Sequence, residues 1–175
     1  MSYPARHTMR LRVMTYNILM GGLGPHGMDR TDSLCAVIES VRPDILALQE
    51  CNGFFPEERG ALRLFEERLG LIGVLGRCDS KLHLAMLARP DLDLRLECHT
   101  GAPMRHGGLH VSVAVPGGRL PLVTMHLNPF VGLGRRLERD QPGHGGGEGP
   151  ARRAGIGVQH RLDGVPSHAV AALDA

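Results

Sequence analysis

The chain has 175 residues, the length of one domain, and its 42% hydrophobic and 22% charged residues are ordinary for a soluble globular protein. Its net charge of +2 is too small to indicate a nucleic-acid partner by electrostatics alone. No apolar run is long enough to cross a bilayer, and the N-terminal MSYPARHTMR lacks the apolar stretch of a secretory signal. We therefore expect a cytoplasmic protein with no membrane span.

The first predicted elements alternate between strand and helix. Residues 11–18 (LRVMTYNI) contain β-branched and aromatic residues and are soon followed by glycines, which predicts a strand. Apolar residues then recur at i, i+3, i+4 and i+7 across residues 34–41, which predicts a helix that Pro43 stops. Residues 45–49 (ILALQ) form a short continuous apolar run, which is typical of a strand buried on both faces.

A second helix and several short strands follow. The helix is expected to begin near Pro56 and to end at Gly70. Its inward face would consist of Leu62, Phe65 and Leu69. Further strands are predicted at residues 72–75, 82–88, 92–98, 109–115 and 120–126, the last two joined by a hairpin turn at Pro116-Gly117-Gly118. Two helices among many short strands predict an α/β fold of packed sheets with helices on the outer faces.

The composition changes in the last quarter of the chain. Residues 138–153 contain no Leu, Ile, Val, Met or aromatic residue, so they are not expected to form a strand of the same sandwich. Residues 165–173 regain a weak helical pattern. We therefore divide the chain into a disordered N-terminus (1–9), a folded domain (10–133), a Gly- and Arg-rich disordered segment (134–164) and a short C-terminal helix or tail (165–175).

Three polar residues, Asn17, Glu50 and His126, stand at the C-terminal ends of predicted strands. Strand ends hold side chains on rigid supports at a sheet edge. Carboxylate and amide oxygens are hard ligands that suit Mg²⁺ or Mn²⁺ rather than zinc, and a nearby histidine can donate to a phosphoryl oxygen. Taken singly, each residue also has a structural interpretation, Glu50 as a solvated strand cap and His126 as a structural histidine.

The contexts of these residues are VMTYNIL, RPDILALQE and LVTMHLNPF, in this order along the chain. The triplet resembles the endonuclease/exonuclease/phosphatase superfamily, the DNase I-like hydrolases. The resemblance covers roughly residues 10–136, and RPDILALQE is its most specific part. It implies a DNase I-like α/β sandwich, two packed mixed sheets with outer helices, that is incomplete at the C-terminus.

The resemblance also implies a role for each matching residue. Asn17 organises the metal site, Glu50 coordinates Mg²⁺ or Mn²⁺, and His126 donates a hydrogen bond to the scissile phosphate. Asn128, two positions further on, contacts substrate. The implied reaction is the in-line attack of an activated water on a phosphodiester or phosphomonoester.

Two motifs of the superfamily have no match in this sequence. No Gly-Asp-x-Asn segment follows the strand with His126, and no closing Asp-His pair occurs; Asp163 and His168 lack the right context. Loss of a general base alone typically removes about 10²- to 10⁴-fold of rate. The sequence therefore predicts an impaired phosphoester hydrolase or, as the alternative, an inactive truncated or frameshifted relative that at most binds a phosphorylated ligand. The Gly-, Arg- and Pro-rich composition after Gly134 is what GC-rich DNA read out of frame would encode.

Other polar residues are given structural interpretations. His99, His106 and His110 lack the spacing of a metal-binding helix and are expected to be surface loop histidines. Cys35, Cys51, Cys78 and Cys98 form no CxxC pair and are expected to be buried free thiols. Low charge and only two Tyr and four Phe favour a phosphorylated small molecule or lipid head group over nucleic acid as the partner. We expect a monomer.

Overall fold

The computed structural model describes residues 9–100, 106–127, 154–155 and 168–174. The described strands form two sheets. The first runs in the order β3 (Ile72–Gly76), β4 (Leu84–Ala88), β2 (Ile45–Gln49), β1 (Arg10–Asn17) and β9 (His168–Asp174). The second runs β5 (Arg95–Thr100), β6 (Gly108–Val115), β7 (Gly118–Met125) and β8 (Ala154–Gly155). Two helices, α1 (Thr31–Val41) and α2 (Ala61–Leu69), and three short turns of 3₁₀ helix, η1 (Met20–Gly22), η2 (Pro25–Gly27) and η3 (Pro90–Leu92), complete the described elements.

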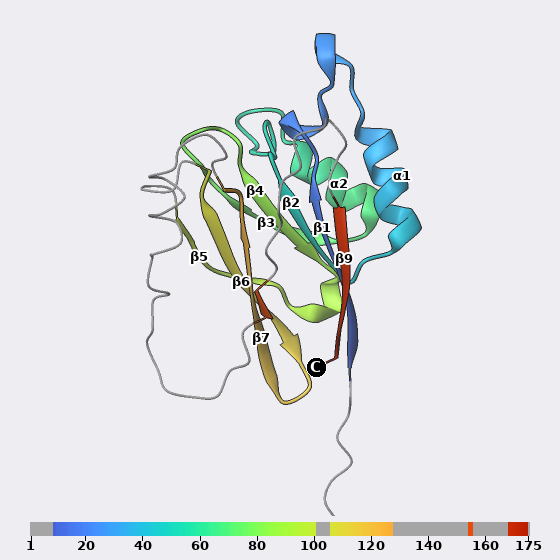
Figure 1. The fold of residues 1–175 in the computed structure, drawn as a ribbon, viewed down its shortest axis with the longest axis vertical. Coiled ribbons are helices and arrows are strands. Elements are labelled where there is room, and N and C mark those ends of the chain that lie inside the picture. Colours follow the sequence, from blue (N-terminus) through green and yellow to red (C-terminus); the bar gives the residue numbers. More distant parts are fainter. Residues whose placement is uncertain (1–8, 101–105, 128–153, 156–167, 175) are drawn as a thin grey trace, which may run out of the picture.

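The elements are stacked in layers, with α1 and α2 on one face of the first sheet and the second sheet against its other face (Figure 1). Alternation along the central strands produces two cores, because successive side chains of a strand point to opposite faces. Met14 and Leu48 belong to the core under the helices, whereas Val13 and Ala47 belong to the core between the sheets. The predicted fold class, α/β with two packed sheets and outer helices, is confirmed.

The two central strands have the environment that the sequence predicts. All five residues of β2 are buried, as expected of a strand covered on both faces. β1 and β2 are parallel neighbours, with Val13 paired to Ile45 and Asn17 paired to Gln49. Because parallel strands end at the same edge of a sheet, Asn17 and the residue after Gln49 are brought together.

Several predicted boundaries are wrong. The second helix begins at Ala61 rather than near Pro56, because Gly60 adopts a left-handed conformation (φ 61°) directly before it. Its predicted inward residue Phe65 is fully buried, with Leu62 and Leu69 packed beside it. The strand predicted at residues 92–98 begins only at Arg95, after the turn η3.

The C-terminal residues differ from their predicted helix. His168–Asp174 form strand β9, antiparallel to β1, although residues 165–175 were expected to be a short helix or tail. In the predicted disordered segment, Ala154–Gly155 form the short strand β8 beside β7. The remainder of that segment lies outside the described residues, as do residues 1–8 of the N-terminus predicted to be disordered (1–9). The division into domains stays a prediction.

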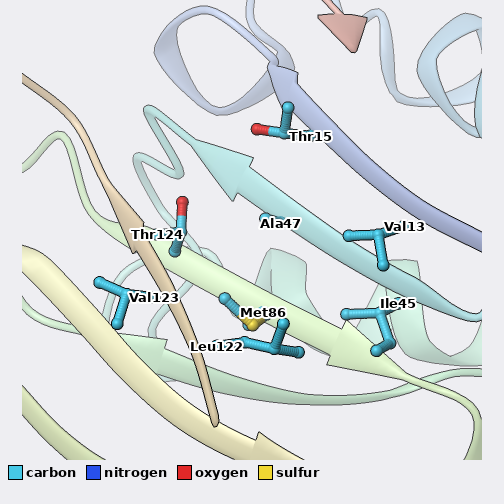
Figure 2. A pocket seen from close by; sticks show the side chains of 8 residues that line it. All are labelled: Val13, Thr15, Ile45, Ala47, Met86, Leu122, Val123 and Thr124. Atoms are coloured by element: carbon cyan, nitrogen blue, oxygen red, sulfur yellow. The ribbon is translucent and has the colours of Figure 1, made fainter. Parts of the chain in front are cut away.

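A small pocket lies between the two sheets (Figure 2). Its lining is formed mostly by apolar side chains that β1, β2, β4 and β7 direct toward one another: Val13, Thr15, Ile45, Ala47, Met86, Leu122, Val123 and Thr124. The two polar residues, Thr15 and Thr124, are both hydrogen bonded to Gln49. The pocket therefore belongs to the sandwich core and has no free polar side chain to recognise phosphate.

Candidate functional site

The ends of three strands meet at one place. Asn17 is the last residue of β1, Glu50 follows β2, and His126 follows β7 of the opposite sheet. Nδ2 of Asn17 donates to Oε1 of Glu50 at 2.9 Å. Nε2 of His126 lies 3.6 Å from the same oxygen. The structure thus brings together the amide, carboxylate and imidazole that the sequence singled out.

Glu50 is held by the chain around it. Oε2 of its side chain accepts a 3.3 Å hydrogen bond from the backbone N–H of Met20, and its carbonyl oxygen accepts the N–H of Gly21 at 2.6 Å. The side chain is only 12% exposed. Among the described residues, its one partner that can carry a positive charge is His126. Glu50 is therefore neither a solvated strand cap nor half of an ion pair with lysine or arginine.

The backbone at this edge adopts conformations that residues other than glycine rarely use. Glu50, Leu19 and Met20 all have positive φ, of 61°, 54° and 52°. Gly21 also has positive φ, and a Cβ there would lie 1.9 Å from the carbonyl oxygen of Asn52, so no other residue fits. Strained backbone of this kind persists where surrounding structure enforces it and is concentrated at functional sites.

Gln49 connects the two sheets directly beneath the site. Its Nε2 donates to Oγ1 of Thr15 on β1 at 2.9 Å and to Oγ1 of Thr124 on β7 at 3.1 Å. The side chain is 4% exposed, so water does not replace these bonds readily. Thr124 lies two residues before His126. This bridge therefore fixes the position of His126 relative to the first sheet.

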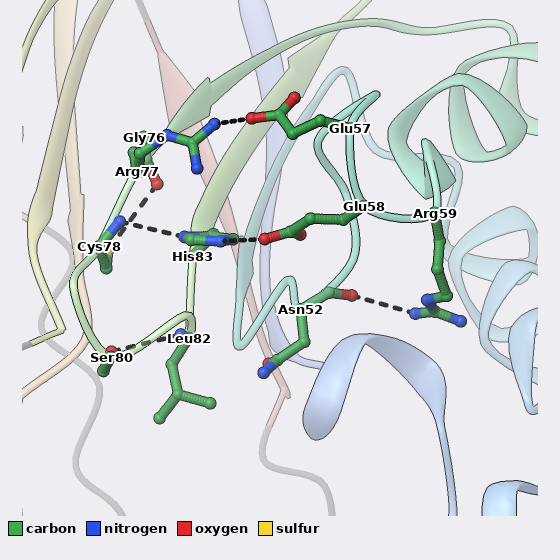
Figure 3. A network of polar contacts seen from close by, with 10 residues as sticks. All are labelled: Asn52, Glu57, Glu58, Arg59, Gly76, Arg77, Cys78, Ser80, Leu82 and His83. Atoms are coloured by element: carbon green, nitrogen blue, oxygen red, sulfur yellow. Dashed lines mark hydrogen bonds and ion pairs between the residues drawn. The ribbon is translucent and has the colours of Figure 1, made fainter.

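A second polar network supports the loop that follows Glu50 (Figure 3). Cys51 donates its N–H to the carbonyl oxygen of His83 at 2.8 Å. The buried His83 ring accepts the N–H of Cys78 at Nδ1 (3.0 Å), which leaves Nε2 to donate to Glu58 at 3.1 Å. Arg59 donates to the carbonyl oxygens of Gly21 and Asn52. These contacts hold the loops on both sides of Glu50, and sequence patterns did not reveal them.

The predicted environments of three histidines differ from those in the structure. His106 was expected on the surface, but it is 7% exposed. Its ring meets that of His126 edge to face, with centroids 4.9 Å apart. His99 is exposed on β5 and His110 is half-buried on β6, so neither lies in the predicted loop. His106 is buried because its segment is folded back against the loop between β3 and β4, a contact that no local pattern encodes.

The cysteines follow their prediction with one exception. Cys35, Cys51 and Cys78 are buried free thiols, whereas Cys98 is exposed on β5. Burial raises the pKa of the Cys78 thiol to about 11 and raises the pKa of the Cys51 thiol well above its ordinary value. The buried thiols are therefore protonated and unreactive at neutral pH.

The donor set at this edge fits a hard divalent cation. Mg²⁺ prefers oxygen ligands, keeps several waters and is often held by one or two carboxylates. Glu50 supplies one such carboxylate, with Asn17 and Met20 fixing its two oxygens. Within the described ranges no cluster of three or more His, Cys, Asp or Glu residues could hold a metal alone. Asn128, the fourth predicted site residue, lies outside the described residues.

Comparison with solved structures identifies proteins whose fold is similar to that of this chain. The ANGEL2 structure, a 2′,3′-cyclic phosphatase in complex with adenosine-2′,3′-vanadate, is similar with a TM-score of 0.52 and 21% identity, over 69% of this chain and 42% of that one. TDP2 of D. rerio in complex with a single-strand DNA product has a TM-score of 0.54 and 18% identity, over 74% and 51%. The human Nocturnin catalytic domain with bound sulfate has a TM-score of 0.50 and 20% identity, over 73% and 54%.

These neighbours are members of the endonuclease/exonuclease/phosphatase superfamily, and the chain has their DNase I-like fold over its N-terminal part. The chain spans about half the length of the structures it matches. No protein-family model and no curated protein sequence matches it. In the part of the chain that the structure describes, no helix is long and apolar enough to cross a membrane.

Proposed function

We propose that the chain is a divalent-metal-dependent hydrolase of phosphodiesters or phosphomonoesters whose turnover is impaired because the Gly-Asp-x-Asn and Asp-His motifs are missing from this sequence. The observation that carries this proposal is the meeting of Asn17, Glu50 and His126, through contacts of 2.9 and 3.6 Å, at residues far apart along the chain. The likeness in fold to phosphoesterases supports it.

Each side chain has one role in the proposal. Glu50 holds Mg²⁺ or Mn²⁺, which when bound stabilises negative charge on the phosphate and the leaving oxygen. Asn17 orients Glu50, a role supported by the direction of its Nδ2 toward Oε1. His126 donates from Nε2 to a phosphate oxygen. The predicted contact of Asn128 with substrate remains part of the proposal.

The test is hydrolysis of bis-p-nitrophenyl phosphate with Mg²⁺ or Mn²⁺. Glu50→Ala should abolish turnover, and His126→Ala should lower kcat by about 10²- to 10³-fold, as expected when one preorganised hydrogen-bond donor is lost. Glu67→Ala is the matched control, because its carboxylate is 67% exposed on α2, away from the strand ends. Turnover that persists in Glu50→Ala would contradict the proposal.

The second candidate is a binding protein without turnover. It is favoured by the sequence after His126, in which no Gly-Asp-x-Asn segment supplies the residue that positions the attacking water. Such a protein would bind inorganic phosphate only in the presence of metal, would lose this binding in Glu50→Ala, and would hydrolyse nothing.

The proposed substrate is a phosphorylated small molecule or lipid head group. Two structural neighbours were solved with a nucleotide analogue and with single-strand DNA, so a short single-strand DNA is the decisive competitor. Inhibition at micromolar DNA concentration would overturn the preference for small substrates. The expected monomeric state and cytoplasmic location stay predictions, to be measured by light scattering and by imaging of a tagged chain.

A further inference from the structure

His106 is a buried histidine beside the site to which the proposed function assigns no role. Its ring packs against the ring of His126 with centroids 4.9 Å apart and an angle of 65° between the planes. Nε2 of His126 in turn lies 3.6 Å from Oε1 of Glu50. The imidazole of His126, 6% exposed, therefore contacts the carboxylate and a second imidazole.

The ring of His106 is fixed by the loop between β3 and β4. Its Nδ1 lies 3.0 Å from Oγ of Ser80. The same hydroxyl oxygen accepts the N–H of Leu82 at 3.2 Å, a bond drawn in Figure 3. Because a hydroxyl group both donates and accepts, this hydrogen bond holds the ring of His106 in either of its tautomers.

The backbone of residues 106–107 is also held by hydrogen bonds and close contacts. The carbonyl oxygen of His106 accepts a hydrogen bond from Sγ of Cys78 at 2.8 Å. Gly107 has φ +72°, and a Cβ there would lie 2.6 Å from that Sγ and 2.8 Å from the carbonyl oxygen of Thr100. The carbonyl oxygen of Gly107 accepts the N–H of His126 at 3.4 Å. Residues 106–107 thus join the β3–β4 loop to the end of β7.

We propose that His106 is a positioning residue that holds the imidazole of His126 in the orientation that presents Nε2 to a bound phosphate. This role rests on the proposed function, in which His126 donates to phosphate. A ring that is already held loses less rotational freedom when phosphate binds. Holding one side chain in advance strengthens binding by about two- to tenfold.

The experiment uses the full chain with ¹⁵N-labelled histidine and two variants. His106→Gln removes the ring beside His126, whereas Ser80→Ala keeps the ring and removes the hydrogen bond that fixes it, together with the bond from the N–H of Leu82. The first readout is the pair of ring ¹⁵N shifts of His126 without ligand, at mildly alkaline pH where a free imidazole is neutral. The second is the affinity for inorganic phosphate in the presence of Mg²⁺.

In the wild-type chain we expect the proton of His126 on Nε2, facing Glu50. In His106→Gln the ring shifts should move toward those of a mixture of tautomers, and phosphate affinity should fall by about two- to tenfold. Ser80→Ala should change both in the same direction by less. His99→Gln, at an exposed histidine of β5, should change neither.

Unchanged His126 ring shifts in both His106→Gln and Ser80→Ala would overturn the positioning role. This result is distinguishable from failure of the proposed function, which would appear as a wild-type chain that binds no phosphate with Mg²⁺ or Mn²⁺. The ring shifts are measured without ligand, so they decide the role of His106 in either case. Far-ultraviolet circular dichroism verifies that each variant is folded.

Discussion

Nδ2 of Asn17 donates to Oε1 of Glu50 at 2.9 Å, across the ends of the parallel strands β1 and β2. The amide oxygen of Asn17 accepts the N–H of Leu19 at 3.0 Å, so the orientation of the amide is set from both sides. The carboxylate of Glu50 is thereby held in place before any cation arrives.

Asn17→Ala should weaken the binding of Mn²⁺. Removing a group that orients a metal ligand typically lowers metal affinity by about 10- to 100-fold, and we expect the lower end because Met20 still holds the other oxygen. Titration followed by the electron paramagnetic resonance signal of free Mn²⁺ measures the change. Equal Mn²⁺ affinity in Asn17→Ala and the wild-type chain would show that Asn17 does not orient Glu50.

The positive φ of Glu50 makes a prediction about stability. A left-handed conformation costs a residue with a Cβ about 1 kcal/mol more than it costs glycine. The metal-free variant Glu50→Gly should therefore have a free energy of unfolding about 1 kcal/mol higher than Glu50→Ala. Urea denaturation measures both values.

Glu39 supplies the control for this comparison. It lies within helix α1, where glycine is less favourable than alanine by about 1 kcal/mol. Glu39→Gly should therefore be less stable than Glu39→Ala, the opposite order. If the pair at Glu50 followed the order at Glu39, the backbone there would not be strained.

Gln49→Met tests the bridge between the sheets. The substitution leaves the hydroxyls of Thr15 and Thr124 without the amide they contact, in a buried setting. Leaving buried polar groups without a partner costs about 1–3 kcal/mol, which we expect as the loss in the free energy of unfolding. Adding Thr15→Val and Thr124→Val should restore much of this loss. No recovery in the triple variant would assign the loss to packing instead.

The raised pKa of the buried Cys78 thiol predicts a lower free energy of unfolding at alkaline pH. Burial raises the pKa of Cys78 from 9.0 to about 11, so the unfolded chain releases this proton at lower pH than the folded chain. The stabilisation is complete below about pH 9 and is lost as the pH rises toward 11. We expect this thiol alone to lower the free energy of unfolding by about 2 kcal/mol across this window.

Cys78→Ala should reduce that pH dependence. The remainder is due to the raised pKa values of Cys35, Cys51 and Tyr16, which burial also causes. Urea denaturation at several pH values between 8 and 11 is the measurement. Cys98→Ala serves as the control because Cys98 is exposed. A stability that is constant over the window would mean that the Cys78 thiol is not desolvated in the folded chain.

Local patterns predicted the elements that carry the site but not their surroundings. The continuous apolar run at 45–49 and the β-branched and aromatic residues at 11–18 indicated two strands, because both patterns favour extended backbone in a buried sheet. The start of α2 was wrong because Glu57 and Glu58, which suit the first turn of a helix, instead pair with Arg77 and His83 of another loop. Whether those contacts form depends on residues distant in the chain.

The sequence by itself determined which side chains end the strands: Asn17, Glu50 and His126 occur in strand contexts that the amino-acid types alone make recognisable. Only the tertiary structure decided that they meet, because the register of β1 against β2 and the packing of β7 over them depend on two cores built from the whole domain. It also decided that His106 is buried against His126. Burial depends on which residues pack over a side chain. The residues that pack over His106 belong to a loop about 25 residues earlier in the chain.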